Sequence, residues 1–525
     1  DAYQLLYNLP VNQTVVLKAT NAKSVYTYLH SEQKAIFNSK VTGGDIIHTE
    51  NHFNDFTVQS LLPNYLSRQG PCMAKADVNK DGREDLFIGG AKGSPGQLSI
   101  QNAGGDFALS KQPDIIKDSL AEDVSAVFFD ANGDGYPDLY VGSGGYEFDE
   151  TDILLQDRLY INNGKGDFVK AGNALPQMLT STGCVKAADI DGDGDMDLFV
   201  GGRVVPGKYP MATESYILLN DGGGKFTNAA SAIAPSVKNI GMVTDALWTD
   251  LNKDGKSDLI IVGEWMPIKV FINTNGKLED ASAKYIHFAS SGWWNKILAD
   301  DFDGDGDADI IIGNLGANAQ FRASQKEPLS IYYKDFDGNG SVDPIFCYYI
   351  NGVSYPAASR DDLMEQLPVL KKKFNNYSSY ANATIKDIFS PEQLKDAGLL
   401  SVEMLSTVYL QNNGDSVFVM NSLPQEAQYA PVCAIASADV NKDGKKDIIL
   451  AGNNAWTRIK FGRYRANHGI MLAGDGKGGF NYVPQYKSGL KLRGDVRSMD
   501  FIRVGNKDLL TVGMNNAALI SYSFD

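Results

Sequence analysis

One nine-residue pattern, D-x-[DN]-x-[DN]-G-x-x-D, constrains the fold of this chain more than any other feature. Its fullest copy lies at residues 189–197, and it recurs at 77–85, 130–138, 250–258, 301–309, 335–343 and 439–447. Runs of Asp, Asn and Gly are common in turns. Seven copies with one spacing instead indicate a structural unit that the chain repeats.

Each copy holds oxygen ligands suited to a hard cation. The side chains at positions 1, 3, 5 and 9 supply carboxylate or amide oxygens, and position 7 can add a backbone carbonyl. Such a set suits Ca²⁺, which takes about six to eight oxygens at ~2.3–2.6 Å, better than Mg²⁺, which keeps several waters in a small octahedral shell. Zinc is disfavoured because no His or Cys accompanies the carboxylates. Position 6 is Gly in every copy, as a sharp turn with positive φ requires.

We therefore predict up to seven Ca²⁺ sites, and their regular placement favours a structural role over a catalytic one. The predicted metal-ligating residues are Asp77, Asn79, Asp81, Arg83, Asp85, Asp130, Asn132, Asp134, Tyr136, Asp138, Asp189, Asp191, Asp193, Asp195, Asp197, Asp250, Asn252, Asp254, Lys256, Asp258, Asp301, Asp303, Asp305, Asp307, Asp309, Asp335, Asp337, Asn339, Ser341, Asp343, Asp439, Asn441, Asp443, Lys445 and Asp447.

The charge of the chain has a local source. The 525 residues carry a formal net charge of −16, which argues against nucleic acid as a partner. Positions 1, 3, 5 and 9 of the seven loops hold 23 aspartates, so bound Ca²⁺ would offset most of the negative charge. The four cysteines are far apart and are interpreted as buried free thiols.

The segments around each Asp loop predict a four-stranded unit. In the third copy, residues 184–188 form a strand that enters the loop and 197–200 a strand that leaves it. Residues 215–219 form a third strand, and a turn at 220–225 leads into a fourth. Four strands every ~50–60 residues are typical of a blade of a β-propeller, with the Asp loop between strands 1 and 2.

The spacing of the loops predicts one insertion. The copy at 335–343 follows its predecessor after 34 residues, and the next copy comes 104 residues later. We expect an insertion at 314–405 that carries its own calcium hairpin and short helices. One helix is predicted from Arg360, and another from the N-cap Ser390 to a stop near Gly398.

Ring closure is predicted from the two ends of the chain. A copy starting at Asp500 keeps its strands and loses its ligands, and the chain ends after the third strand of that unit. Residues 54–63 resemble fourth-strand segments, so we expect them to complete the last blade. The predicted fold is an all-β propeller over 54–525 with seven blades, or eight if the 335–343 hairpin is itself a blade. Residues 1–53 are interpreted as a linker or the remnant of a preceding domain.

The Asp loop and its apolar Gly-Gly exit resemble the FG-GAP/VCBS repeats of integrin α-chain propellers over about residues 56–525. Several stretches, among them residues 263–268 (Gly-Glu-Trp-Met-Pro-Ile) and 313–316 (Gly-Asn-Leu-Gly), are similar to large secreted VCBS-repeat proteins of Bacteroidetes with an ASPIC/UnbV-type segment. The resemblance implies a secreted or cell-surface location and a chain that is the C-terminal portion of a longer protein. It implies no established activity.

The face opposite the Asp loops is the predicted ligand face. Its loops join strands 2 to 3 and strands 4 to 1, and they are rich in aromatic, Arg and Asn side chains, which provide stacking area and directional hydrogen bonds. The predicted ligand-binding residues are Arg203, Tyr209, Glu264, Trp265, Trp293, Trp294, Asn314, Trp456, Arg463 and Tyr464.

The sequence favours a calcium-stabilised extracellular module that binds a protein or a glycan. It holds no apolar run of 18 residues and no Ser/His/Asp or metal–His pattern, so neither a membrane span nor a catalytic residue is predicted. Two alternatives stay open. One is a polysaccharide-active enzyme, a lyase or glycosidase, for which a carboxylate beside a basic residue in the central funnel would be evidence. The other is a structural component of a larger surface complex.

Overall fold

The computed structural model describes residues 2–4, 6, 12, 14–25, 34–40, 46–414 and 417–524. The chain divides into two compact units, residues 1–35 and 36–525. In the first unit, β1 (Ala2–Tyr3) pairs with β2 (Ser24–Val25), and a 3-10 helix η1 (Ala19–Asn21) lies between them in sequence. Much of the segment predicted as a linker or domain remnant, including residues 7–11, 26–33 and 41–45, lies outside the described residues.

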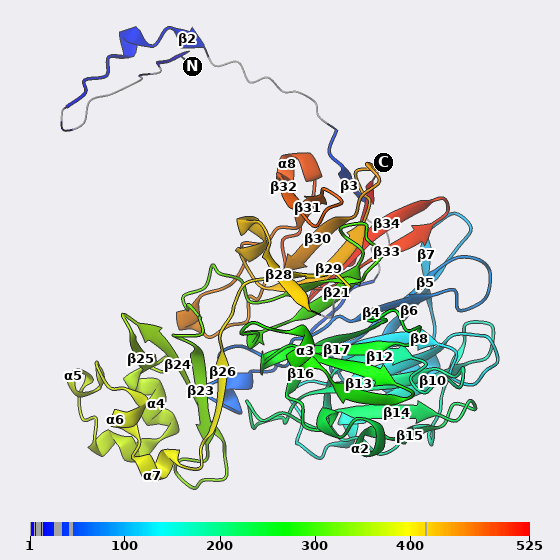
Figure 1. The fold of residues 1–525 in the computed structure, drawn as a ribbon, viewed down its shortest axis with the longest axis horizontal. Coiled ribbons are helices and arrows are strands. Elements are labelled where there is room, and N and C mark those ends of the chain that lie inside the picture. Colours follow the sequence, from blue (N-terminus) through cyan, green and yellow to red (C-terminus); the bar gives the residue numbers. More distant parts are fainter. Residues whose placement is uncertain are drawn as a thin grey trace. The chain divides into compact units, whose positions relative to one another are not determined.

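Seven sheets within the described part of the second unit repeat one antiparallel order of four strands, and we call them blades 1 to 7 (Figure 1). Blades 1 to 4 consist of β4 (Met73–Ala76), β5 (Asp85–Ile88), β6 (Gln97–Gln101) and β7 (Phe107–Ser110); β8 (Asp123–Phe129), β9 (Asp138–Ser143), β10 (Arg158–Asn162) and β11 (Phe168–Lys170); β12 (Ser181–Ala188), β13 (Asp197–Val204), β14 (Tyr216–Asn220) and β15 (Phe226–Asn228); and β16 (Met242–Thr249), β17 (Asp258–Met266), β18 (Lys269–Thr274) and β19 (Lys277–Asp280), with β20 (Gly292–Trp293) added to β17. Blades 5 to 7 consist of β21 (Lys296–Asp300), β22 (Asp309–Gly313), β27 (Val408–Asn412) and β28 (Phe418–Ser422); β29 (Val432–Ala438), β30 (Asp447–Gly452), β31 (Ile470–Gly474) and β32 (Phe480–Val483); and β33 (Val496–Val504), β34 (Lys507–Met514), β35 (Ile520–Phe524) and β3 (Phe37–Lys40).

The blades close into a ring. Their first strands contact one another in the cyclic order β4, β8, β12, β16, β21, β29, β33 and back to β4. The seven first strands therefore surround a common axis, which makes this unit a β-propeller. The Asp loops join first to second strands, so they all lie on one face of the ring.

One-turn helices occupy connections between blades. They are α1 (Pro113–Lys117), α2 (Ala230–Ile233), α3 (Ser282–Tyr285) and α8 (Gln485–Ser488). The 3-10 helices η4 (Pro235–Val237) and η6 (Gln425–Gln428) also lie between blades, and η3 (Ile153–Leu155) and η7 (Ile459–Phe461) lie between second and third strands.

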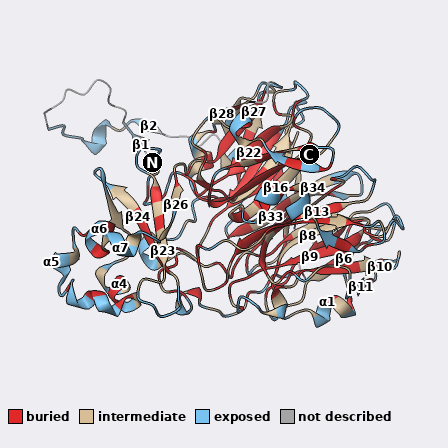
Figure 2. Cartoon of the chain, turned by 60° about the horizontal axis from the view of Figure 1, so that its bottom comes forward, coloured by how far each residue is buried: buried red, intermediate tan, exposed pale blue. Residues whose placement is uncertain are grey.

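The second strand of a blade is its most buried element. All residues of β5, β9, β13, β17, β22 and β30 are buried, and Figure 2 shows the buried residues concentrated on the strands. The apolar run after each Asp loop is thus a strand packed between two neighbouring blades. The glycines that follow this run allow a neighbouring backbone segment to lie close to them: a Cβ on Gly202 would lie 2.3 Å from the carbonyl oxygen of Glu214.

The predicted insertion is present between β22 and β27. It contains a sheet in the order β25-β24-β23-β26, formed by β23 (Leu329–Lys334), β24 (Asp343–Ile350), β25 (Val353–Pro356) and β26 (Gly398–Val402). It also contains α4 (Arg360–Gln366), η5 (Pro368–Lys372), α5 (Tyr377–Tyr380), α6 (Ile385–Ile388) and α7 (Pro391–Leu394). Its strand order differs from that of the blades, and its first strand is not part of the ring of first strands. Figure 1 shows its strands and helices grouped beside the ring.

The helix predicted from Arg360 is confirmed, and Ser359 caps it with a capping box. Ser390 also forms the predicted capping box, but its helix ends at Leu394. Gly398 is the first residue of β26, so it starts a strand and does not stop the helix.

The predicted closing strand is wrong in its residues. The fourth strand of blade 7 is β3, which pairs antiparallel with β35, and Phe37 lies 6.3 Å from Tyr522 between ring centroids. Residues 55–57 of the predicted strand instead form the 3-10 helix η2 (Asp55–Thr57), capped by Asn54. Asp55 is fully buried and accepts the backbone N–H groups of Leu66 and Ser67 at 2.5 and 3.0 Å. These bonds hold the segment in a compact turn, where it cannot extend along a sheet edge.

A cluster of buried carboxyl groups lies where residues after β3 meet blades 1 and 2. Burial is the largest cause that raises the pKa of Glu50, Glu122 and Glu147, and the charges of Glu50 and Glu147 raise the pKa of Glu122 further. Glu122 is fully buried and accepts the backbone N–H of Lys92 through Oε2 at 2.6 Å. Within the described residues, its Oε1 has no hydrogen-bond partner. Because ionisation here is unfavourable, Glu122 holds its proton in the fold at a pH where it would lose it in the unfolded chain.

We predict that Glu122→Gln stabilises the protein, and more so at high pH. A pKa that is raised in the folded state destabilises the fold increasingly as the pH rises above the ordinary pKa of a glutamate. Gln does not ionise, so it removes this destabilisation while keeping an acceptor for the backbone N–H of Lys92. Thermal melts at pH 5 and pH 8 should give the larger rise in Tm at pH 8, by a few degrees. Glu279→Gln, on an exposed strand position, is the matched control. An equal effect at both pH values would contradict the assignment.

Candidate functional sites: the Asp loops and the axial cavity

The seven Asp loops share one hydrogen-bonded conformation. In every copy the position 1 carboxylate accepts the backbone N–H of the position 6 glycine at 2.7–3.1 Å. That glycine has φ between +81° and +96°, as predicted from its invariance among the copies. Position 4 also has positive φ, from +56° to +82°, and is always Lys or Gly. This second left-handed position was not predicted, although the restriction of position 4 to Lys or Gly was its signal.

The position 9 aspartate is buried in every copy and ties the loop to the blade. Its Oδ2 accepts the backbone N–H of position 2 at 2.9–3.2 Å. In the six blade loops its Oδ1 accepts a backbone N–H at the end of the third strand, at 2.7–3.2 Å. In the insertion, Asp343 binds the side chain of Gln366 in place of that strand, at 2.6 Å.

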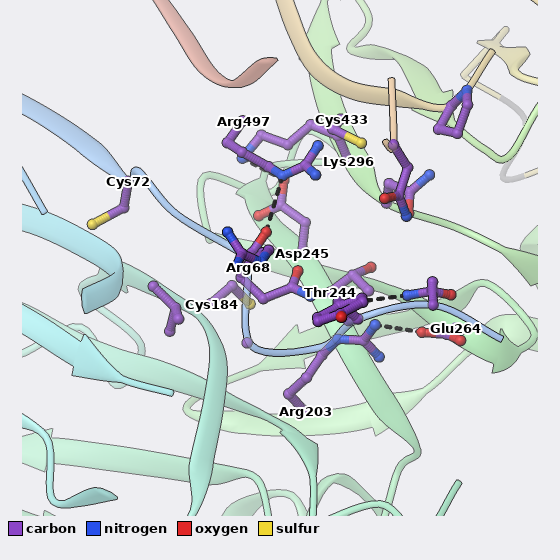
Figure 3. A pocket seen from close by; sticks show the side chains of 18 of the residues that line it. Arg68, Cys72, Cys184, Arg203, Thr244, Asp245, Glu264, Lys296, Cys433 and Arg497 are labelled. Atoms are coloured by element: carbon purple, nitrogen blue, oxygen red, sulfur yellow. Dashed lines mark hydrogen bonds and ion pairs between the residues drawn. The ribbon is translucent and has the colours of Figure 1, made fainter. Parts of the chain in front are cut away.

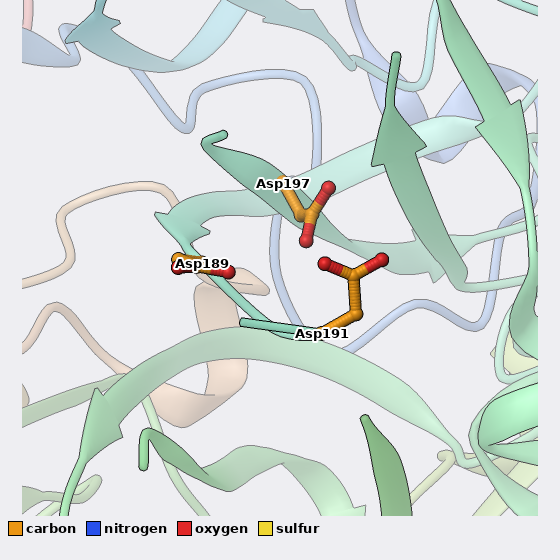
Figure 4. Close-up of side chains that lie close together, drawn as sticks. All are labelled: Asp189, Asp191 and Asp197. Carbon is orange, nitrogen blue, oxygen red and sulfur yellow. The ribbon is translucent and has the colours of Figure 1, made fainter. Parts of the chain in front are cut away.

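Carboxylates converge in three of the loops. Among the described residues, these groups are Asp189, Asp191 and Asp197; Asp301, Asp303 and Asp309; and Asp335, Asp337 and Asp343, with ligand oxygens within 4.8 Å of one another in each. Figure 4 shows the first group, with its side chains directed toward one another. In the other four loops position 3 is Asn, so an amide oxygen replaces one carboxylate.

These oxygens fit a hard divalent cation. Three negative charges lie close together, and burial raises the pKa of Asp197 to about 6 even though backbone N–H groups lower it. A cation at the centre would offset this repulsion, and an all-oxygen set is what Ca²⁺ prefers. In two loops a basic side chain at position 7 competes with a cation for the position 5 aspartate: Arg83 forms an ion pair with Asp81, and Lys256 lies 4.0 Å from Asp254.

We predict that removing calcium lowers Tm. We also predict that Asp193→Asn weakens metal binding alone, whereas Asp197→Asn destabilises the loop itself. Each site filled at 100 times its Kd adds about 2.7 kcal/mol. Asp193→Asn keeps the acceptor for the Asp195 N–H but loses a charged ligand, so it should reduce only the difference between calcium and EDTA. Asp197→Asn places an amide against backbone donors and should cost about 1–3 kcal/mol with EDTA too. An unchanged Tm with EDTA would contradict the metal assignment.

A cavity of about 250 Å³ lies on the axis of the ring. Residues from the first strands of all seven blades line it, from Met73 in blade 1 to Arg497 in blade 7. Its lining continues into loops of the face opposite the Asp loops, including Trp456 and Tyr464, and into the start of the insertion at Leu315 and Phe321. Cys72, Cys184 and Cys433 also line it. All four cysteines lie in the described part of the chain and are free thiols, as predicted.

Two groups of paired charges line the cavity. Arg203 forms an ion pair with Glu264, whose Oε1 accepts the hydroxyl of Tyr209 at 2.5 Å. Burial and the charge of Glu264 raise the pKa of Tyr209 well above its ordinary value, so this hydroxyl stays a donor. In the second group, Asp245 lies 2.9 Å from Lys186 and 3.0 Å from Lys296. Figure 3 shows Arg203 beside Glu264 and Lys296 above Asp245.

The structure divides the predicted ligand-face residues into two sets. Arg203, Glu264, Trp293, Trp456 and Tyr464 line the cavity. Tyr209, Trp265, Trp294 and Asn314 are buried and do not line it, while Arg463 is exposed.

The insertion contributes to the burial of Trp265. Phe346 of β24 packs against Trp265 and Trp293, with ring centroids 5.7 and 6.3 Å apart, and Leu329 and Ile331 of β23 join the same apolar cluster. Nothing in the sequence indicated that the insertion covers these tryptophans.

Comparison with known proteins identifies repeats of the same kind. The family model of the FG-GAP-like repeat matches residues 77–141, 150–200 and 250–312. Cartilage acidic protein 1 of Xenopus tropicalis is 22% identical over 310 residues, which cover 53% of this chain and 45% of that protein. The human protein of the same name is 22% identical over 313 residues, 53% of this chain and 44% of that protein. The chain therefore spans less than half the length of these curated relatives.

More distant similarities extend over shorter or more divergent regions. Phosphatidylinositol-glycan-specific phospholipase D of Bos taurus is 28% identical over 163 residues, 27% of this chain and 19% of that protein. Among solved structures, BBS1N in complex with ARL6DN gives a TM-score of 0.40 at 11% identity, over 93% of this chain and 97% of that chain. Within the described residues no helix has the length and hydrophobicity of a membrane span. The ring of four-stranded blades makes residues 36–525 a β-propeller, and three stretches of this unit match the FG-GAP-like repeat.

Proposed function

We propose that the chain is a calcium-stabilised extracellular module that binds a protein or glycan through the face opposite the Asp loops. The observation that supports this most directly is the axial cavity, whose lining on that face combines aromatic and cationic side chains. Trp456 lies 5.7 Å from Tyr65 between ring centroids, and the guanidinium of Arg68 lies 3.9 Å from the centre of the Trp456 ring. Aromatic and Arg side chains are enriched among residues that dominate binding energy.

Backbone strain on this face supports the same proposal. Trp265 has φ of +59° and Asn453 of +89°, and both are buried. A bulky residue rarely adopts positive φ, and such strain gathers at functional sites, where the surroundings hold it in place. Trp265 follows Glu264 directly, and its indole N–H donates to the Tyr209 hydroxyl at 2.6 Å. The strained Trp265 thereby fixes the Tyr209 hydroxyl, which in turn holds Glu264 of the cavity lining.

The extracellular part of the proposal is supported by the Asp loops and by the names of relatives. Extracellular calcium modules are filled at ~0.1–1 mM Ca²⁺, a concentration that the cytosol does not sustain. Two of the relatives are named cartilage acidic protein 1, which fits a secreted or cell-surface location. A calcium-loaded, rigid ring would hold the loops of the opposite face in place for a ligand.

We predict that Trp456→Ala removes binding detected on protein and glycan arrays. Loss of a central aromatic contact costs about 2 kcal/mol, or roughly 30-fold in affinity. Tyr377→Ala, an exposed aromatic on α5 of the insertion, is the control and should bind normally, and melting curves check that both variants fold. Binding that survives Trp456→Ala but is blocked at the Asp-loop face would instead favour a structural component of a surface complex.

A second candidate function, a polysaccharide lyase or glycosidase, is favoured by the carboxylates paired with basic residues in the cavity. Against it, both oxygens of Glu264 are already engaged, by Arg203 and by Tyr209, so neither is free to move a proton. We predict no product release when a broad panel of acidic and neutral polysaccharides is incubated with the calcium-loaded chain. Release of unsaturated or reducing sugars that is lost in Glu264→Gln would establish the enzyme.

A further inference from the structure

The charge of the axial cavity is opposite to that of the chain. Its lining holds five cationic side chains, Arg68, Lys186, Arg203, Lys296 and Arg497, against the two carboxylates of Asp245 and Glu264, in a chain of net charge −16. One further carboxylate, Asp495, lies 3.7 Å from Arg497 but is not part of the lining. The excess of positive charge persists when Asp495 is counted.

Both carboxylates of the lining are saturated by the protein itself. Glu264 accepts from Arg203 and Tyr209. Asp245 contacts two lysines and the backbone N–H of Ile297 at 3.2 Å. Burial alone would raise the pKa of Asp245, but the two lysines lower it below its ordinary value. Neither carboxylate therefore has strong capacity left for a cationic ligand.

The unsatisfied groups of the cavity are mainly donors. Within the described residues, Arg203 Nη1, Arg68 Nε, Asn295 Nδ2 and Ser498 Oγ are buried and have no hydrogen-bond partner, and all four residues line the cavity. Arg203 is 9% exposed and Arg68 8% exposed. They come from blades 3, 5 and 7 and from the segment before blade 1, and Figure 3 shows Arg68, Arg203 and Arg497 around the same space. Buried polar groups in native proteins normally have partners, so an acceptor belongs here.

The size and walls of the cavity restrict that acceptor further. At about 250 Å³ it is near the lower end of small-molecule sites, which span ~300–1,000 Å³. Trp293, Phe321 and Phe461 contribute apolar walls, on which the faces of a sugar ring can pack. The planar guanidinium groups match a carboxylate, which accepts two parallel N–H bonds.

We propose that the axial cavity binds a sugar acid through its carboxylate, either as a free uronate or as the uronate end of an acidic glycan. The inference rests on the proposed function, because it names the ligand class for the same face. Arg203 and Arg68 bind the carboxylate, Asn295 and Ser498 bind hydroxyl groups of the ring, and Trp456 and Tyr464 form the mouth through which a glycan chain leaves.

The proposal is tested by titrating the calcium-loaded chain with two uronates, glucuronate and galacturonate, and with the neutral sugars glucose and galactose. A uronate-terminated oligosaccharide is titrated in the same way. Saturation-transfer NMR and calorimetry are the measurements. We expect the uronates to bind and the neutral sugars to bind at least about tenfold more weakly, because charge-assisted hydrogen bonds are lost. Sulfate at the same concentrations separates a sugar-acid site from a general anion site. Equal binding of neutral sugars, or binding of sulfate but of no uronate, would overturn the inference.

Variants test individual residues of the cavity, and two of them lie outside the ion pairs of the fold. Asn295→Ala and Ser498→Ala remove groups that have no protein partner through the named atoms, so they should fold normally and weaken uronate binding by about three- to tenfold. Arg203→Lys keeps the charge beside Glu264 but loses the second arm, and we expect about tenfold or greater loss. Lys225→Gln, an exposed lysine beside a hairpin turn of blade 3, removes one positive charge as the control. Uronate binding that is unchanged in all three cavity variants contradicts the proposal.

The failure of this inference and that of the proposed function give different results. Should arrays detect a partner sensitive to Trp456→Ala while no uronate enters the cavity, the binding module stands and the sugar-acid site does not. Should free uronates bind but the uronate-terminated oligosaccharide fail to bind, the cavity takes only free sugar acids and the glycan-binding function fails at this site.

Discussion

The buried carboxylate at position 9 of each Asp loop is the interaction on which the rest of the propeller depends. It accepts one backbone N–H from the loop and, in the six blades that carry such a loop, another from the third strand. One side chain therefore fixes the loop conformation and the register of strands that are far apart in sequence. Its burial is tolerable because both oxygens are hydrogen-bonded, and its repetition gives six of the seven blades the same internal contacts.

Contacts between blades extend from the same place. Asn220, whose backbone N–H binds Asp197, donates its side-chain amide to the carbonyl of Ala131 in the preceding blade at 2.9 Å. Asn162 and Asn273 make the equivalent contact at 2.8 Å, to Val78 and Ile190. The Asp loops of blades 1 to 4 are thus joined by protein hydrogen bonds, and a cation in each of these loops would add to a framework that already exists. Such a framework accounts for the regular placement of the loops without a catalytic role.

Features encoded within a single repeat could be predicted from the sequence, and features that depend on distant parts of the chain could not. The Asp loops, the starts of the blades and the helix at Arg360 follow from local spacing and capping. The closing strand did not, because residues 54–63 and 37–40 are both short segments near the N-terminus, and only pairing with β35 at the other end of the chain distinguishes them. The burial of Trp265 was likewise hidden, since Phe346 reaches it from an insertion some 80 residues away.

Acidic and basic side chains lie in different parts of this propeller, although the net charge of the chain adds them together. Acidic groups gather in the Asp loops at one face, where cations can neutralise them. Basic groups gather around the axis, because every first strand contributes to the lining and three of the contributed residues, Lys186, Lys296 and Arg497, are cationic. Seven strands surround too wide a space for their own side chains to fill, so a central cavity is a consequence of the ring. Its positive lining is not required by the fold, and for that reason it is the part of this molecule where ligand specificity is expected to reside.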